Sequence, residues 1–208
     1  YKKLLAIQKT SLTVALEAGR ACFRKKLNKN IEIENLFNSA DALSRLGLRM
    51  IKVYFMYGFP DEEKEDLLAI GNLIKELLDK TNFKINVSLN LFIPKPFSPW
   101  ENKPLLGPAK AEEKKDTILA NIPKRKRIKL SYSSINTSLI EAIISRGGRD
   151  LGSVFIELNR QRKELLDKNL LFNWPVWKDV LEKKDINWQR YIKAETKNFP
   201  WSFIDNRG

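Results

Sequence analysis

A run of apolar and aromatic residues between two helix-like stretches constrains the fold most; it reads MIKVYFMYGFP at positions 50–60. Its Ile, Val, Tyr and Phe residues favour a buried strand, and the Gly and Pro at its end stop that strand. Because successive side chains of a strand point to opposite faces, one face would be aliphatic. The other face would carry Lys52, Tyr54 and Met56 and would end at Gly58, where a ligand can approach the backbone closely.

Two further stretches alternate in the same way, SLTVALE at 11–17 and INVSLNLFI at 85–93. Amphipathic helical patterns separate the three strands, one over 33–46 and one that begins at Pro60-Asp61. This order predicts parallel strands joined by right-handed crossovers. Helices would cover only the aliphatic face, so the mixed face would line the lumen of a barrel or half-barrel, with ligands at the carboxyl ends of the strands. The side chains expected around that polar cavity are Glu17, Lys52, Tyr54, Asn86, Ser88 and Asn90.

The second half of the chain is predicted to be mostly helical. A loop over 94–108 holds five of the nine prolines and marks the expected domain boundary. We expect half of an α/β barrel over 1–108 and a mainly α-helical region with one short strand over 109–208. The strand is expected over 128–132, and the helices over 109–120, 136–145, 150–166, 174–183 and 188–193.

Composition excludes several classes of site. The chain has no histidine and a single cysteine, Cys22, so it offers no disulfide framework, no usual zinc site and no histidine general base. We expect neither catalytic nor metal-binding residues within it. The sequence shows no signal peptide and no apolar run long enough for a membrane span, which favours a cytoplasmic protein without a membrane partner.

The net charge is +13 at pH 7, which suits an anionic partner such as RNA. A basic cluster lies at Lys124–Arg127 and is a candidate nucleic-acid contact. Lysine is nevertheless scattered along the whole chain, and this favours solvated faces over one dominant patch. Both interpretations stay open at this point.

Four segments in fixed order resemble the second half of a radical S-adenosylmethionine enzyme: LTVALEAG, LNKNIEIENL, IKVYFMYGFPDEEKEDL and VSLNLFIPKPFSPW. The segment EAIISRGGRDLGSVF and the closing PWSFID resemble the C-terminal region of a poorly characterised subfamily, whose members often carry an N-terminal cobalamin-binding-type domain. The resemblance covers nearly the whole chain. It implies a (β/α)6 partial TIM-type barrel, of which this chain would hold strands four to six, followed by a mostly helical appendage.

The resemblance also implies a binding site for S-adenosylmethionine at the strand ends. Glu17 would bind the ribose hydroxyls, and Lys29 would meet the carboxylate of the ligand. The strand that carries Tyr54 would pack against adenine near Gly58 to Pro60. The backbone from Phe92 to Pro94 would meet the adenine edge.

One departure from the family concerns activity. The CxxxCxxC motif, whose thiolates hold a 4Fe–4S cluster, is absent from this sequence. The family places that motif upstream, so we interpret the chain, which starts at Tyr1, as a catalytically incomplete fragment of an iron–sulfur oxidoreductase-type enzyme. Its expected partners are the missing N-terminal half, which would hold the cluster and, if it is used, cobalamin, and an unknown substrate. Two alternatives stay open, a basic tRNA-binding module and a non-catalytic interaction domain.

Two expectations concern packing. The strand over 11–17 would have a bare edge, which could pair two copies into a homo-oligomer unless Leu4, Leu5 and Ile7 cover it. Arg146 and Arg149 flank two glycines between helices and are expected to be structural. Their expected partners are helix-end carbonyls, Glu141 and Asp150.

Overall fold

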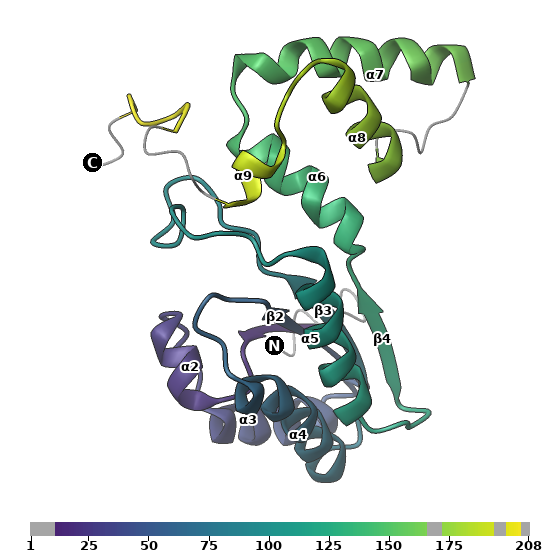
Figure 1. Cartoon of the computed structure of the whole chain (residues 1–208). Coiled ribbons are helices and arrows are strands. Elements are labelled where there is room, and N and C mark those ends of the chain that lie inside the picture. The colour runs from purple at the N-terminus through teal and green to yellow at the C-terminus, as the bar shows by residue number, and fades with distance from the viewer. Residues whose placement is uncertain (1–10, 166–171, 194–198, 205–208) are drawn as a thin grey trace. The chain divides into compact units, whose positions relative to one another are not determined.

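The computed structural model describes residues 11–165, 172–193 and 199–204 (Figure 1). The chain forms two compact units. We call the first the sheet unit; it comprises Tyr1–Asn90 and Glu112–Tyr132. We call the second the helical unit; it comprises Leu91–Ala111 and Ser133–Gly208. Leu4, Leu5 and Ile7, the residues expected to cover the strand edge, lie outside the described residues.

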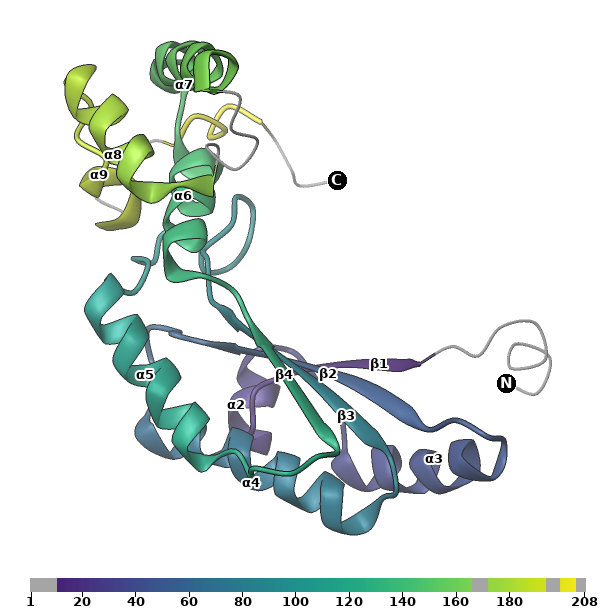
Figure 2. The ribbon, with the colours of Figure 1, turned by 90° about the vertical axis from the view of Figure 1, so that its right-hand side faces the viewer.

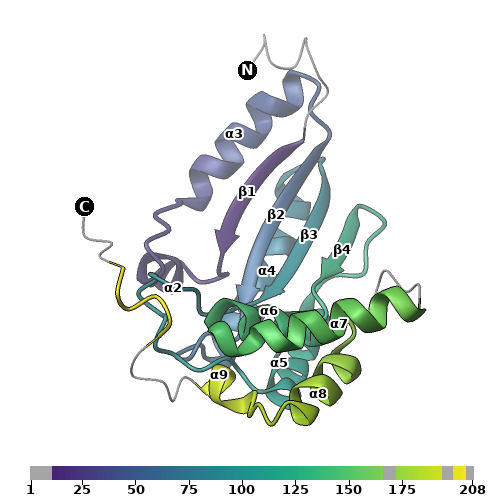
Figure 3. The ribbon, with the colours of Figure 1, turned by 90° about the horizontal axis from the view of Figure 1, so that it is seen from above.

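The protein is an α/β protein with a four-stranded parallel sheet in the order β1-β2-β3-β4. Each strand lies beside the next one along the chain (Figure 3). Leu12 of β1 lies beside Ile51 of β2, and Ile85 of β3 lies beside Ile128 of β4. The strand expected in the C-terminal region is therefore the fourth strand of this sheet. The strands are β1 (Leu12–Glu17), β2 (Met50–Tyr57), β3 (Lys84–Leu91) and β4 (Ile128–Tyr132).

Helices α3, α4 and α5 lie along one face of the sheet (Figure 2). The side chains of β2 and β3 that point toward them are nearly all fully buried, as alternation requires. On the opposite face, Lys52 and Met56 are half-buried and Tyr54 is 37% exposed. Lys52 therefore points away from the helices, as predicted. The helices of this part are α2 (Ala21–Lys26), α3 (Ile33–Arg45), α4 (Lys64–Lys80) and α5 (Pro108–Asn121).

The predicted start of the second helix at Pro60-Asp61 is wrong, because α4 begins at Lys64. Glu63 is its N-cap, and the Glu63 N–H donates to Asp66 Oδ2 at 3.0 Å. This local hydrogen bond satisfies one of the free donors at a helix start and so fixes the first turn. The residues between the strand and Glu63 form a separate turn, which belongs to the candidate site described below.

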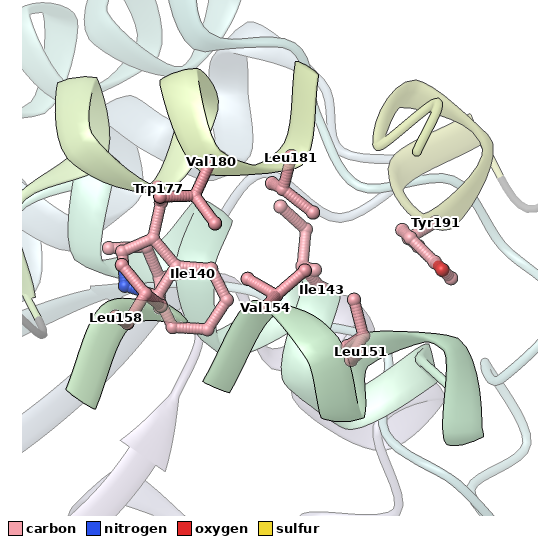
Figure 4. Close-up of a cluster of buried hydrophobic side chains, with 9 residues drawn as sticks. All are labelled: Ile140, Ile143, Leu151, Val154, Leu158, Trp177, Val180, Leu181 and Tyr191. Carbon is pink, nitrogen blue, oxygen red and sulfur yellow. The ribbon is translucent and has the colours of Figure 1, made fainter. Parts of the chain in front are cut away.

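The helical unit has its own apolar core, formed by α6, α7, α8 and α9 (Figure 4). Trp177 is 1% exposed and packs with Val154, Leu158 and Val180. Trp174 and Trp188 pack against this core and meet edge to face, with ring centroids 4.8 Å apart. The elements are α6 (Ile135–Arg146), the short 3-10 helix η1 (Arg149–Leu151), α7 (Gly152–Leu165), α8 (Trp174–Lys183) and α9 (Gln189–Lys193).

Arg146 is structural, as predicted, and only 3% of its surface is exposed. Its guanidinium donates to the carbonyls of Tyr191 and Glu101, each at 2.8 Å, and to the carbonyl of Lys103. Burial lowers the pKa of Arg146. One guanidinium thus ties α6 to α9 and to the loop that contains Glu101 and Lys103, through backbone acceptors.

The prediction that Glu141 and Asp150 are the acidic partners of Arg146 and Arg149 is wrong. Glu141 pairs with Lys95, and Asp150 pairs with Arg190. Arg149 is exposed. The reason is geometric, since the buried guanidinium of Arg146 reaches carbonyls that are distant in sequence, which local spacing does not reveal.

Candidate ligand site at the strand ends

The end of β1 departs from the predicted alternation. Ala15 lies beside Tyr54, but the next pair is Glu17 with Phe55, so one extra residue is inserted in β1. Glu17 has a φ of 64°, in the left-handed region that few residues other than glycine adopt. Such bulges redirect a side chain at a strand end and occur frequently beside functional sites. The bulge therefore sets the direction of the Glu17 carboxylate, which parity alone does not predict.

The structure brings Glu17 and Lys29 together, although twelve positions separate them in the chain. Lys29 Nζ lies 3.2 Å from Glu17 Oε1, with the side chains 41% and 15% exposed. The short helix α2 connects the two residues and brings the chain back to the end of β1. Asn28 then adopts a φ of 56°, and the Lys29 N–H donates to the Arg24 carbonyl at 2.8 Å. A carboxylate and an ammonium thus meet at the carboxyl end of an edge strand.

Close packing against α4 holds the Glu-Ala-Gly turn after β1. A Cβ atom on Gly19 would lie 2.4 Å from the backbone of Ala69 and of Ile70. Arg24, which is 4% exposed, donates to the carbonyls of Gly19 at 2.5 Å and Ala18 at 3.4 Å. Only glycine fits this approach of a helix to a turn. Sequence analysis did not identify Arg24, because a basic residue in a helical turn carries no distinguishing signal.

The turn after β2 contains Gly58 and Pro60, two further residues assigned by the resemblance. Gly58 is buried and has a φ of 89°. Phe59 is 2% exposed and packs edge to face on Phe23 of α2, with ring centroids 5.4 Å apart. Pro60 is exposed. The turns after β1 and β2 therefore lie next to each other, joined through α2.

A buried carboxylate, which the sequence did not single out, lies behind this second turn. Glu62 Oε2 accepts from the Gly58 N–H at 2.7 Å and from Lys114 Nζ at 2.9 Å. Its side chain is 3% exposed, and burial raises the pKa of Glu62. In the sequence, Glu62 is one of several acids that follow Pro60, and nothing distinguishes it from the others. Its partner Lys114 is fifty-two positions away, so no local pattern marks the pair.

Tyr54 lies on the face of the sheet opposite α3, α4 and α5, beside Ala15. Asn86, Ser88 and Asn90 share this face, where all three are half-buried. Across the strands, Asn86 Nδ2 contacts Met50 Sδ at 3.2 Å. The predicted parity thus holds for β2 and β3. Whether these side chains line a closed cavity stays a prediction.

Phe92 and Pro94, the remaining assigned residues, belong to the helical unit. Both are buried there, and Phe92 packs edge to face on Trp100 with ring centroids 5.9 Å apart. The structure brings Glu17, Lys29, Gly58 and Pro60 to one end of the sheet unit. It describes Phe92 and Pro94 only within the second unit.

Beside the edge strand β1 lies an apolar groove of about 450 Å³. It opens between the start of β1 and α3, and within the described residues β1 pairs only with β2. The lining residues are Leu12, Asn30, Ile31, Glu32, Asn35, Leu36, Ser39, Ala42, Leu43 and Leu46.

The carboxylate of Glu17 and the ammonium of Lys29 at the strand ends suit a polar organic ligand. A carboxylate can accept from two hydroxyl groups, and an ammonium can pair with a carboxylate. Among the described residues, no group of three or more His, Cys, Asp or Glu side chains could hold a metal ion. Cys22 is exposed, and an iron–sulfur cluster does not fit the ligands that these residues offer.

Comparison with known proteins gives a distant relative. The chain is 28% identical over 182 residues to MJ0966, an uncharacterised protein of Methanocaldococcus jannaschii. The match takes in 82% of this chain and 40% of that protein, so the chain spans less than half of the relative's length. No family model matches the chain, and no solved structure matches it. Within the described segments, no helix has the length and apolarity needed to span a membrane.

Proposed function

We propose that the chain is part of a radical S-adenosylmethionine enzyme and supplies strand ends that bind this ligand. The observation that carries the proposal is the pairing of Glu17 with Lys29 at 3.2 Å. These are the two charged residues that the resemblance assigns to the ribose and to the carboxylate of the ligand. In the structure these two charges satisfy each other. Bound ligand would replace this one ion pair with hydroxyls for the carboxylate and a carboxylate for the ammonium.

The remaining parts of the proposal follow from the resemblance. The parallel sheet, with helices along one face, suits strands of a partial (β/α)6 barrel, and Tyr54, Gly58 and Pro60 would shield the adenine from water. The cluster, and cobalamin if it is used, would be held by another part of a longer cytoplasmic protein. Reductive cleavage of S-adenosylmethionine would belong to that whole protein. The groove beside β1 would be covered by another part of that longer protein or by a second copy of this chain.

Calorimetric titration of the chain with S-adenosylmethionine tests the proposal. We expect saturable binding that Glu17→Gln and Lys29→Met each weaken by about tenfold, because each removes one charge-assisted interaction. Lys25→Met, an exposed lysine of α2, is the matched control and should leave the affinity unchanged. Absence of saturable binding, or equal affinities in all four proteins, would refute the proposal.

RNA binding is a second candidate, favoured by three consecutive exposed cations in the loop before β4: Lys124, Arg125 and Lys126. Their charges would contact phosphates without reading sequence. A titration with tRNA at rising salt should then show a linear fall of log affinity with log salt, with a slope reduced in the triple alanine variant. Flat or absent binding would exclude this candidate.

A further inference from the structure

One oxygen of Glu62 joins the backbone at the end of β2 to helix α5. It accepts the Gly58 N–H at 2.7 Å and Lys114 Nζ at 2.9 Å. We propose that Glu62 is a positioning residue that holds the Gly58–Pro60 turn in the conformation needed for ligand binding, with Lys114 as its counter-ion. This inference rests on the proposed function for the ligand, but the holding of the turn can be measured without any ligand.

The turn needs such a restraint because of its composition. Gly58 has a φ of 89°, and glycine populates positive and negative φ about equally when nothing selects between them. Gly58 is also buried, one residue beyond the end of β2, and a buried N–H donor that lacks an acceptor destabilises the fold. The Glu62 carboxylate supplies that acceptor and thereby selects one backbone conformation.

The acids on either side of Glu62 form ion pairs at the surface. Asp61 pairs with Lys26 at 2.8 Å, and Glu63 pairs with Arg20 at 2.9 Å. Their side chains are 54% and 68% exposed, against 3% for Glu62. Surface pairs of this kind contribute little to stability, whereas the buried pair fixes a geometry. Glu62 is therefore the acid that controls the turn.

The surroundings of Glu62 explain why both donors are needed. Burial raises the pKa of Glu62, and the nearby charge of Asp66 acts in the same direction. The hydrogen bonds from Lys114 and from the Gly58 N–H act in the opposite direction and favour the carboxylate. Tyr57, which precedes Gly58, is fully buried, and its hydroxyl has no hydrogen-bond partner among the described residues. The ionised form of Glu62 is thus held by its own two donors.

Amide hydrogen exchange, followed by NMR on the nitrogen-15-labelled chain, tests the positioning role. In Glu62→Ala we expect the Gly58 amide to exchange about tenfold faster, while the Val53 amide in the middle of β2 keeps its rate. Glu62→Gln retains an acceptor oxygen and should restore most of the protection. Glu65→Ala removes an exposed acid from the first turn of α4 and is the matched control.

Glu62→Asp keeps the charge but withdraws the carboxylate by one methylene, so it tests the same hydrogen bond should Glu62→Ala not fold. Unchanged exchange of the Gly58 amide in Glu62→Ala and in Glu62→Asp would overturn the inference. Titration with S-adenosylmethionine then tests the link to the ligand, since Glu62→Ala should bind several-fold more weakly than wild type. Equal affinities would overturn that link. A wild-type chain that binds no ligand would refute the proposed function, while the exchange rates would still decide whether Glu62 holds the turn.

Discussion

Replacement of Arg127 by alanine should lower the free energy of unfolding by about 2–3 kcal/mol. The Arg127 guanidinium donates to the carbonyls of Leu78 and Thr81, each at 2.7 Å, and of Phe83 at 3.3 Å. These carbonyls lie at and just beyond the C-terminus of α4, where a helix leaves acceptors without partners. A hydrogen bond from a charged donor contributes roughly 1.5–3 kcal/mol, and the alanine variant leaves three acceptors of a half-buried cluster unpaired.

Urea unfolding followed by circular dichroism measures this effect. With a slope of about 2 kcal/mol per molar urea, the midpoint should fall by about 1 M. Arg125→Ala removes an exposed cation two positions earlier and should change stability by less than about 0.5 kcal/mol. Equal midpoints for the two variants would refute the structural role of Arg127 and would return it to the candidate RNA contacts.

Three further predictions concern packing and assembly. Gly19→Ala should destabilise the chain by about 1–3 kcal/mol, because the added Cβ meets the backbone of α4. Gly152→Ala, at a helical position where no described atom lies within 4 Å of the added Cβ, should not destabilise the chain in the same urea titration. Tyr57→Phe should leave the thermal midpoint unchanged or raise it, because the lost hydroxyl is buried with no partner among the described residues, and burial raises the pKa of Tyr57 to about 12. A clear loss of stability would reveal an interaction at that hydroxyl. Light scattering at several concentrations should show pairing through the β1 edge, and a monomer throughout would contradict it.

Periodicity predicted the secondary structure well, because alternation and helical spacing are local properties. The helix Trp174–Lys183 and the strand Ile128–Tyr132 begin and end where the sequence placed them. The predicted start of α4 at Pro60-Asp61 was wrong, since the N-cap hydrogen bond at Glu63 decides where the helix begins. The pairing of the short strand β4 with β3 was not foreseen, because five residues do not specify a partner.

The candidate site was predictable in part. The polar face of β2 followed from its parity, but the bulge at Glu17 did not, since an inserted residue leaves no mark in an alternating pattern. Glu62 contacts Lys114, which lies 52 positions further along the chain, and Arg127 contacts Leu78, which lies 49 positions earlier. Such contacts form only in the folded chain, so composition and spacing assigned both residues to ordinary charged runs.

Chemical-shift mapping of the labelled chain during titration with S-adenosylmethionine tests the central claim most directly. The account predicts saturable shifts concentrated on the amides of Glu17, Lys29 and Gly58, which lie at the ends of β1 and β2. Shifts that fail to saturate, or that concentrate on the loop around Lys124–Arg127 instead, would contradict it.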